Sequence, residues 1–96
     1  MIKNFGNKLA EDLYDDKISK EVKHFPKDLY KTARRKLLFL HDAASINDLR
    51  IPPGNRLELL KGKFKGFYSI QLHDQWRLVF RWQDGDAYNV AVIDYH

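Results

Sequence analysis

The second half of the chain alternates between hydrophobic and polar positions, which is the pattern of half-buried β-strands. Through residues 76–82, large apolar side chains alternate with Arg77, Val79 and Arg81. Residues 67–72 show the same two-residue period. The pattern predicts four strands, at residues 56–60, 67–72, 76–82 and 87–95.

Short polar turns separate the last three of these strands. His73-Asp74 and Asp84-Gly85 stand between them, and an Asp-Gly pair is typical of a type I′ hairpin. The sequence RIPPGNR leads into the first strand and is interpreted as a connector. Because the connections are short, the four strands are expected to form an antiparallel meander.

The first half of the chain has a helical pattern instead. A long helix is expected from Pro26 to Ala44, since apolar residues recur there every three or four positions, with basic side chains nearly opposite. A short strand at residues 2–5 and a helical turn at residues 9–14 are expected before it. We therefore predict an α+β fold in which two N-terminal helices pack on one face of a curved antiparallel sheet, leaving Arg77 and Arg81 on the other face.

Length and composition indicate one domain over residues 1–96. The chain has 96 residues, 44% of them hydrophobic, and contains no cysteine. It shows no apolar run long enough for a signal peptide or a membrane span. We expect a soluble cytoplasmic protein without a membrane association.

Positive charge is concentrated in the middle of the chain. Residues 50–81 contain seven Lys or Arg against two acids, Glu58 and Asp74, a local excess of +5. Such an excess favours a polyanionic partner, although a solvated basic surface would have the same composition.

The sequence ends in Asp94, Tyr95 and His96. An imidazole beside a carboxylate can act as an acid or a base near neutral pH, which RNA cleavage requires. Arg77, Lys61 and Lys65 are candidates to hold the phosphate, and Tyr95 to stack on a base. No cofactor is expected, and no metal site, because the four histidines lack paired ligand spacing. Alternatively, the final histidine is a tail residue and the arginines are merely solvated.

These residues, taken in order, resemble the HigB branch of the RelE toxin superfamily. The resemblance is carried by PPGNRLELLKG, by YSIQLHDQWRLVFRW and by the final DYH, over about the last half of the chain. It implies a microbial-ribonuclease-like fold and a type II toxin that cuts translated mRNA in the ribosomal A site. It also implies inhibition of translation and growth, and a helix-turn-helix, HigA-like antitoxin as partner.

The resemblance also implies roles for individual residues. Asp94, Tyr95, His96 and Arg77 match the catalytic positions of the motifs, and Lys61 matches a lysine near the first strand of the meander. Where some HigB proteins have a histidine, this chain has Glu58, which is interpreted as a general base or a structural residue. The other cations expected to bind RNA or phosphate are Lys65, Arg56 and Arg81.

Two other functions are compatible with the same residues. A ParE-like toxin of the same superfamily would bind DNA gyrase and lack ribonuclease groups, which the DYH ending and Arg77 argue against. A non-catalytic module that binds RNA or protein would explain the basic middle of the chain equally well.

Overall fold

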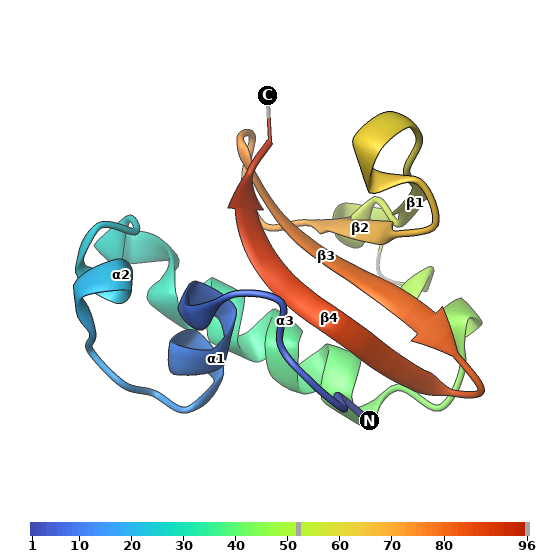
Figure 1. Cartoon of the computed structure of the whole chain (residues 1–96), viewed down its shortest axis with the longest axis horizontal. Helices are drawn as coiled ribbons and strands as arrows, with labels where there is room; N and C mark the ends of the chain where they lie inside the picture. The colour runs from blue at the N-terminus through green and yellow to red at the C-terminus, as the bar shows by residue number, and fades with distance from the viewer. Residues whose placement is uncertain (52, 96) are drawn as a thin grey trace.

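The computed structural model describes residues 1–51 and 53–95, with residue 53 described for its backbone alone. Its centre is a four-stranded antiparallel sheet in the order β1-β2-β3-β4 (Figure 1). The strands are β1 (Glu58–Leu59), β2 (Tyr68–Gln71), β3 (Trp76–Gln83) and β4 (Asp86–Asp94). The predicted antiparallel meander is confirmed.

The strand ends follow local backbone geometry. Asp84 and Gly85 both have positive φ, 52° and 83°, as the predicted type I′ turn between β3 and β4 requires. β1 is shorter than the expected run of residues 56–60, and Arg56, with a φ of 47°, lies outside the extended region.

The helices precede the sheet in the chain. They are α1 (Lys8–Tyr14), α2 (Lys20–Lys23) and α3 (Tyr30–Asp42), and short 3-10 turns include η1 (Lys27–Leu29), η2 (Ile46–Leu49), η3 (Pro53–Asn55) and η4 (Gly62–Phe64). The helix expected over residues 26–44 is divided into η1 and α3. The four-residue α2 was not predicted; the Ser19 side chain caps it by accepting a hydrogen bond from the Val22 backbone amide.

Helices α1 and α3 cover one face of the sheet (Figure 1). Leu37 and Leu40 from α3 pack with Leu78 and Phe80 from β3, and all four are fully buried. The expected two-layer α+β architecture is therefore confirmed. In the described part of the chain, no helix combines the length and the apolar character needed to cross a membrane.

The N-terminal segment runs beside the outer edge of β4. Two isolated parallel bridges, Ile2 with Ala87 and Phe5 with Val90, take the place of the expected short strand. Gly6 is required at this approach, because a Cβ there would lie 2.7 Å from the Asn89 carbonyl oxygen.

Within the described residues, no α-helix covers the opposite face of the sheet (Figure 1). Leu60, Val79 and Ala91 form a small buried cluster on this face. Phe64, Phe67 and Ile93 pack over it and remain partly exposed. We call this surface, which also carries Arg77 and Arg81, the open face.

Candidate active site

Arg77 is the most enclosed cation of the open face. Its side chain is only 15% exposed, and Nη1 lies 3.4 Å from the Ser69 hydroxyl oxygen and 4.0 Å from a carboxylate oxygen of Glu58. Its Nε is buried and makes no hydrogen bond within residues 1–51 and 53–95. An enclosed guanidinium carries its charge in a partly desolvated place, which strengthens its attraction for an anion.

Tyr95 stacks on the same guanidinium. The central carbon of the Arg77 guanidinium lies 5.7 Å from the centre of the Tyr95 ring, within cation–π range. The Tyr95 backbone amide donates a 2.6 Å hydrogen bond to the Gln75 carbonyl, which fixes the chain just beyond β4. The structure thus places the Tyr95 ring against the Arg77 guanidinium.

Glu58 brings a carboxylate to this cluster. Glu58 pairs with Ser69 across β1 and β2, so their side chains leave the sheet on the same face. The Glu58 side chain is 55% exposed, so its contact with Arg77 contributes little to stability. An exposed carboxylate beside a cation remains accessible to a substrate proton.

Asp94 leaves the sheet on the other face. It pairs with Trp76, whose ring packs into the helix-covered core, and it accepts a 3.4 Å hydrogen bond from the Gln75 side-chain amide. The structure therefore brings Tyr95 to Arg77 but directs Asp94 away from both. His96, the expected acid or base, lies outside the described residues.

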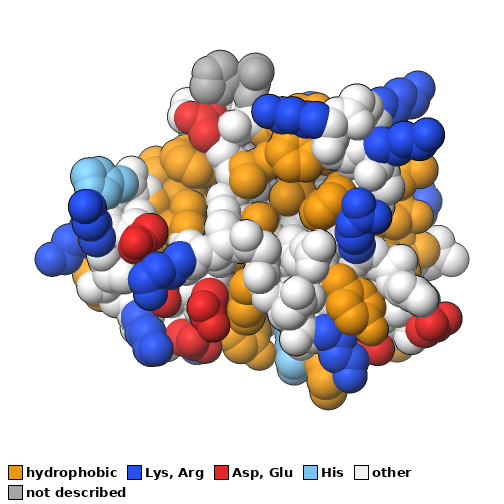
Figure 2. Space-filling model, in the orientation of Figure 1, with side chains coloured by type: hydrophobic (Ala, Val, Ile, Leu, Met, Phe, Trp, Pro, Cys, Tyr) orange, Lys and Arg blue, Asp and Glu red, His pale blue; other side chains and the backbone are white. Residues whose placement is uncertain are grey.

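The remaining predicted cations are all exposed, and Arg81 lies on the open face. Lys61 and Lys65 flank the η4 turn and are exposed, and Arg56 is exposed just before β1. Arg81 stacks on the Phe67 ring, with 4.6 Å between the guanidinium carbon and the ring centre. Figure 2 shows Lys and Arg side chains around apolar ones at the upper right, where Figure 1 has the η4 turn.

Sequence reasoning did not identify Ser69 and Phe64 as part of this site. Ser69 is fully buried, and its hydroxyl accepts from Arg77. The ring of Phe64 lies 6.2 Å from that of Tyr95. The two-residue alternation predicts that Ser69 and Tyr68 lie on different faces of the strand. The contact of Ser69 with Arg77 depends on the register between β2 and β3.

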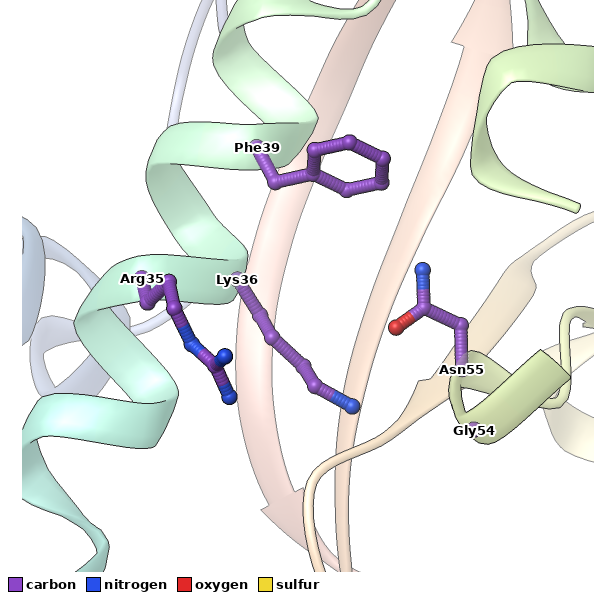
Figure 3. A pocket seen from close by; sticks show the side chains of 5 residues that line it. All are labelled: Arg35, Lys36, Phe39, Gly54 and Asn55. Atoms are coloured by element: carbon purple, nitrogen blue, oxygen red, sulfur yellow. The ribbon is translucent and has the colours of Figure 1, made fainter. Parts of the chain in front are cut away.

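A separate hollow of about 320 Å³ lies between α3 and η3, lined by Arg35, Lys36, Phe39, Gly54 and Asn55 (Figure 3). Burial, with a smaller contribution from Arg35, lowers the pKa of the Lys36 ammonium. Lys36 donates a 2.7 Å hydrogen bond to the Gln71 carbonyl, which ties α3 to β2. This hollow contains none of the residues that the sequence indicated for catalysis.

The family is shown by comparison with known proteins. Residues 3–96 match the family described as the RelE-like toxin of the type II toxin-antitoxin system HigB. The chain belongs to this family of HigB-like toxins. The resemblance stated from the sequence motifs is therefore confirmed.

Two relatives match the chain along its whole length. Toxin HigB-1 of Vibrio cholerae is 43% identical over 96 residues, which cover 100% of this chain and 98% of that protein. Endoribonuclease HigB of Proteus vulgaris is 30% identical over 96 residues, and the match covers 100% of both chains.

The fold of this HigB-like toxin also occurs in a solved structure. A chain of the YoeB-YefM complex from Staphylococcus aureus superposes with a TM-score of 0.59 and 21% sequence identity. The match covers 100% of this chain and 95% of that chain. At this identity the likeness extends to the fold, and it agrees with the RelE-like architecture expected from the sequence.

Proposed function

We propose that this HigB-like toxin is an RNA endonuclease that cuts translated mRNA in the ribosomal A site and so inhibits translation and growth. The observation that carries the proposal is the environment of Arg77. Its guanidinium is largely buried between Ser69, Glu58 and Tyr95, and its Nε has no partner among the described residues. The name of the Proteus vulgaris relative, an endoribonuclease, supports the same activity.

Arg77 would bind the scissile phosphate. Cleavage of RNA by its own 2′-hydroxyl places extra negative charge on the phosphate oxygens in the transition state. A positioned guanidinium in a partly dry site stabilises that charge without reorganisation. Lys61, Lys65, Arg56 and Arg81 would bind the flanking phosphates, and Tyr95 would stack on a base next to the cut.

The chemistry requires one base and one acid. A base removes the 2′-hydroxyl proton, the 2′-oxygen attacks phosphorus, the bond to the 5′-oxygen breaks, and an acid gives that oxygen a proton. Glu58, beside Arg77, and His96, next in sequence to Tyr95, are proposed as this pair. Asp94 would act by orienting the end of β4 through Gln75. Since side chains carry both protons, the proposal assigns no metal ion.

The proposed partners follow from the family. Family members are toxins of a type II toxin-antitoxin system, so we propose a helix-turn-helix, HigA-like antitoxin as the inhibitor of this chain. The ribosome and its mRNA are the proposed substrate complex, and the excess of positive charge in residues 50–81 favours such a polyanion.

Mapping mRNA 5′ ends in growing cells tests this function. Induction of the wild type should produce new 5′ ends inside translated coding regions, in frame with the codons. His96→Ala and Arg77→Ala should remove them, because one loses the proposed acid or base and the other the phosphate ligand. Changes in DNA supercoiling without RNA cuts would support a gyrase-binding toxin instead. Unaffected growth and intact mRNA would support a binding module.

A further inference from the structure

A second hollow, this one on the open face, lies beside the proposed cleavage site. It has a volume of about 310 Å³. Val79, Ala91 and Ile93 line it from the sheet, and Phe64 and Phe67 line it from the chain around η4. Its lining is therefore mainly apolar and includes two aromatic rings. We call it the Phe64–Phe67 hollow.

This hollow is continuous with the cluster around Arg77. Ile93, on its floor, is the direct partner of Arg77 across β3 and β4. Phe64 lines the hollow, and its ring also lies 6.2 Å from the Tyr95 ring. A molecule bound to Arg77 and Tyr95 can therefore extend into the hollow without leaving the open face.

Cations accompany both aromatic rings of the hollow. Arg81 lies over Phe67 at 4.6 Å, and the Lys63 ammonium lies 5.5 Å from the centre of Phe64. Arg77 and Arg81 are four residues apart on β3, roughly 13 Å along an extended strand. That separation is too large for one phosphate, so Arg81 would meet a different nucleotide of the same strand.

Most polar groups at the rim are already engaged within the chain. The Asn7 side-chain oxygen accepts from the Ala10 and Val92 amides, and its nitrogen donates to the Val92 carbonyl. The Asn89 side-chain oxygen accepts from Asn4. Recognition in this hollow would therefore depend on stacking and apolar contact more than on hydrogen bonds to particular base edges.

We propose that the Phe64–Phe67 hollow binds the base of a nucleotide adjacent to the cleaved linkage of single-stranded RNA. This inference rests on the proposed endonuclease function and adds a second base-binding subsite to it. Aromatic rings interleaved with cations are the usual means of binding single strands, and they discriminate weakly among bases because every base has a π-face. The subsite should thus tolerate all four bases, with purines preferred for their larger rings.

Abasic substitution in the mRNA tests the subsite directly. The substrate is an mRNA that wild-type toxin cleaves, presented on ribosomes, with each nucleotide around the cut replaced in turn by an abasic one. For one neighbour of the cut, the toxin concentration giving half-maximal cleavage should rise about 5- to 100-fold, as expected for loss of one base–aromatic stack. Exchanging the base there for another should change it far less.

Variants of Phe67 assign this effect to the hollow. Phe67→Leu should remove most of the abasic effect at that position, and Phe67→Tyr, which keeps the ring, should retain it. Phe39→Leu, in the separate hollow between α3 and η3, is the matched control and should behave as the wild type. Unfolding measurements on each variant establish that the comparison concerns folded protein.

Different results would contradict the base-binding subsite and the endonuclease function. Cleavage of intact mRNA with no abasic effect at any neighbour of the cut would overturn the subsite and leave the nuclease. An abasic effect that persists in Phe67→Leu would also overturn it. The hollow could instead bind an antitoxin side chain. In that case Phe67→Leu would weaken the complex with the antitoxin and leave RNA cleavage normal, and the subsite proposal would be wrong. If intact mRNA is not cleaved at all, both proposals fail.

Discussion

The two faces of the sheet are built from the same strands and differ in what they bury. Beneath the helices, Leu78, Phe80 and Val92 belong to a large apolar core with side chains of α1 and α3. On the open face, the small cluster around Val79 is bordered by Arg77, a cation that is only 15% exposed. The covered face is organised for stability, whereas the open face retains a partly desolvated charge at a cost to stability.

The period of two along a strand makes this division possible. Arg77 and Val79 alternate with Leu78 and Phe80 on β3, so neighbouring residues contribute to different faces. A change in one face can therefore leave the other nearly intact. Stability and activity should therefore respond to different residues, and a variant in which both change where only one should would contradict this division.

The largest effect is expected from truncation of a core residue on the covered face. Phe80 is fully buried and stacks near Tyr68, with 5.9 Å between ring centres. Phe80→Ala should lower the free energy of unfolding by about 3–5 kcal/mol, because it removes apolar contact and leaves a cavity. Urea denaturation measures this, and Ile51→Ala, at a side chain that is 77% exposed, is the control, with an expected loss under about 1 kcal/mol. A loss for Phe80→Ala as small as the control's would contradict the account of the core.

A change on the open face should affect the reaction and spare the fold. Glu58→Gln keeps the shape of the side chain and removes the carboxylate beside Arg77. The cleavage rate should fall about 100-fold, as expected for loss of an acid or base. Affinity for RNA should not fall, since a negative charge near the phosphate is also removed. Single-turnover cleavage and binding assays measure the two effects.

Asp74→Asn is the control for this charge change. Asp74 is the other acid of the basic segment, and it is exposed in the turn between β2 and β3. Its rate should stay within about twofold of the wild type. If Glu58→Gln also leaves the rate unchanged, Glu58 has a structural role alone and the general base must be another group.

The smallest effect concerns the helical layer and depends on pH. Asp12 is buried on α1, and a hydrogen bond from the Ser19 hydroxyl, helped by Lys8, lowers the pKa of its carboxyl below the ordinary 3.8, although burial opposes this. A carboxyl with a lowered pKa in the folded state stabilises the fold above its unfolded-state pKa. That stabilisation is lost as the pH falls through the folded-state pKa.

Asp12→Asn should therefore flatten the acid side of the stability profile. The variant lacks the titrating group, so its free energy of unfolding should fall less steeply than that of the wild type between about pH 5 and pH 2. Urea denaturation at several pH values gives the two slopes. Identical slopes would show that Asp12 does not contribute to acid sensitivity. RNA cleavage near neutral pH should be little changed, because α1 lies on the covered face.

The sequence predicts those parts of the molecule that depend on local patterns. Asp84-Gly85 specifies its hairpin because both residues accept positive φ, and the apolar repeat before Ala44 specifies α3. The three motifs of the second half predict the family, which the comparisons confirm. The sequence did not predict α2, because its four residues are too few to show a helical repeat that differs from a loop.

The arrangement of the site depends on contacts between distant segments. Tyr95 reaches Arg77, and Asp94 turns toward Gln75, because β4 pairs with β3 in one particular register. A shift by one residue would exchange these two side chains between faces. The contact of Ser69 with Arg77 likewise depends on how β2 pairs with β3. The Phe64–Phe67 hollow depends on how the chain around η4 packs on the sheet. Residue patterns alone do not predict either arrangement.

The most direct test of the central claim removes the charge of Arg77 and follows cleavage and stability in the same preparation. Arg77→Met keeps an unbranched side chain, somewhat shorter and without the charge, and Arg34→Met on the exposed surface of α3 is the matched loss of an arginine. The account predicts that Arg77→Met lowers single-turnover mRNA cleavage by at least about 100-fold. Its free energy of unfolding should equal or exceed that of the wild type, and Arg34→Met should cleave normally. Wild-type cleavage by a folded Arg77→Met variant would contradict the claim that the open face holds the scissile phosphate.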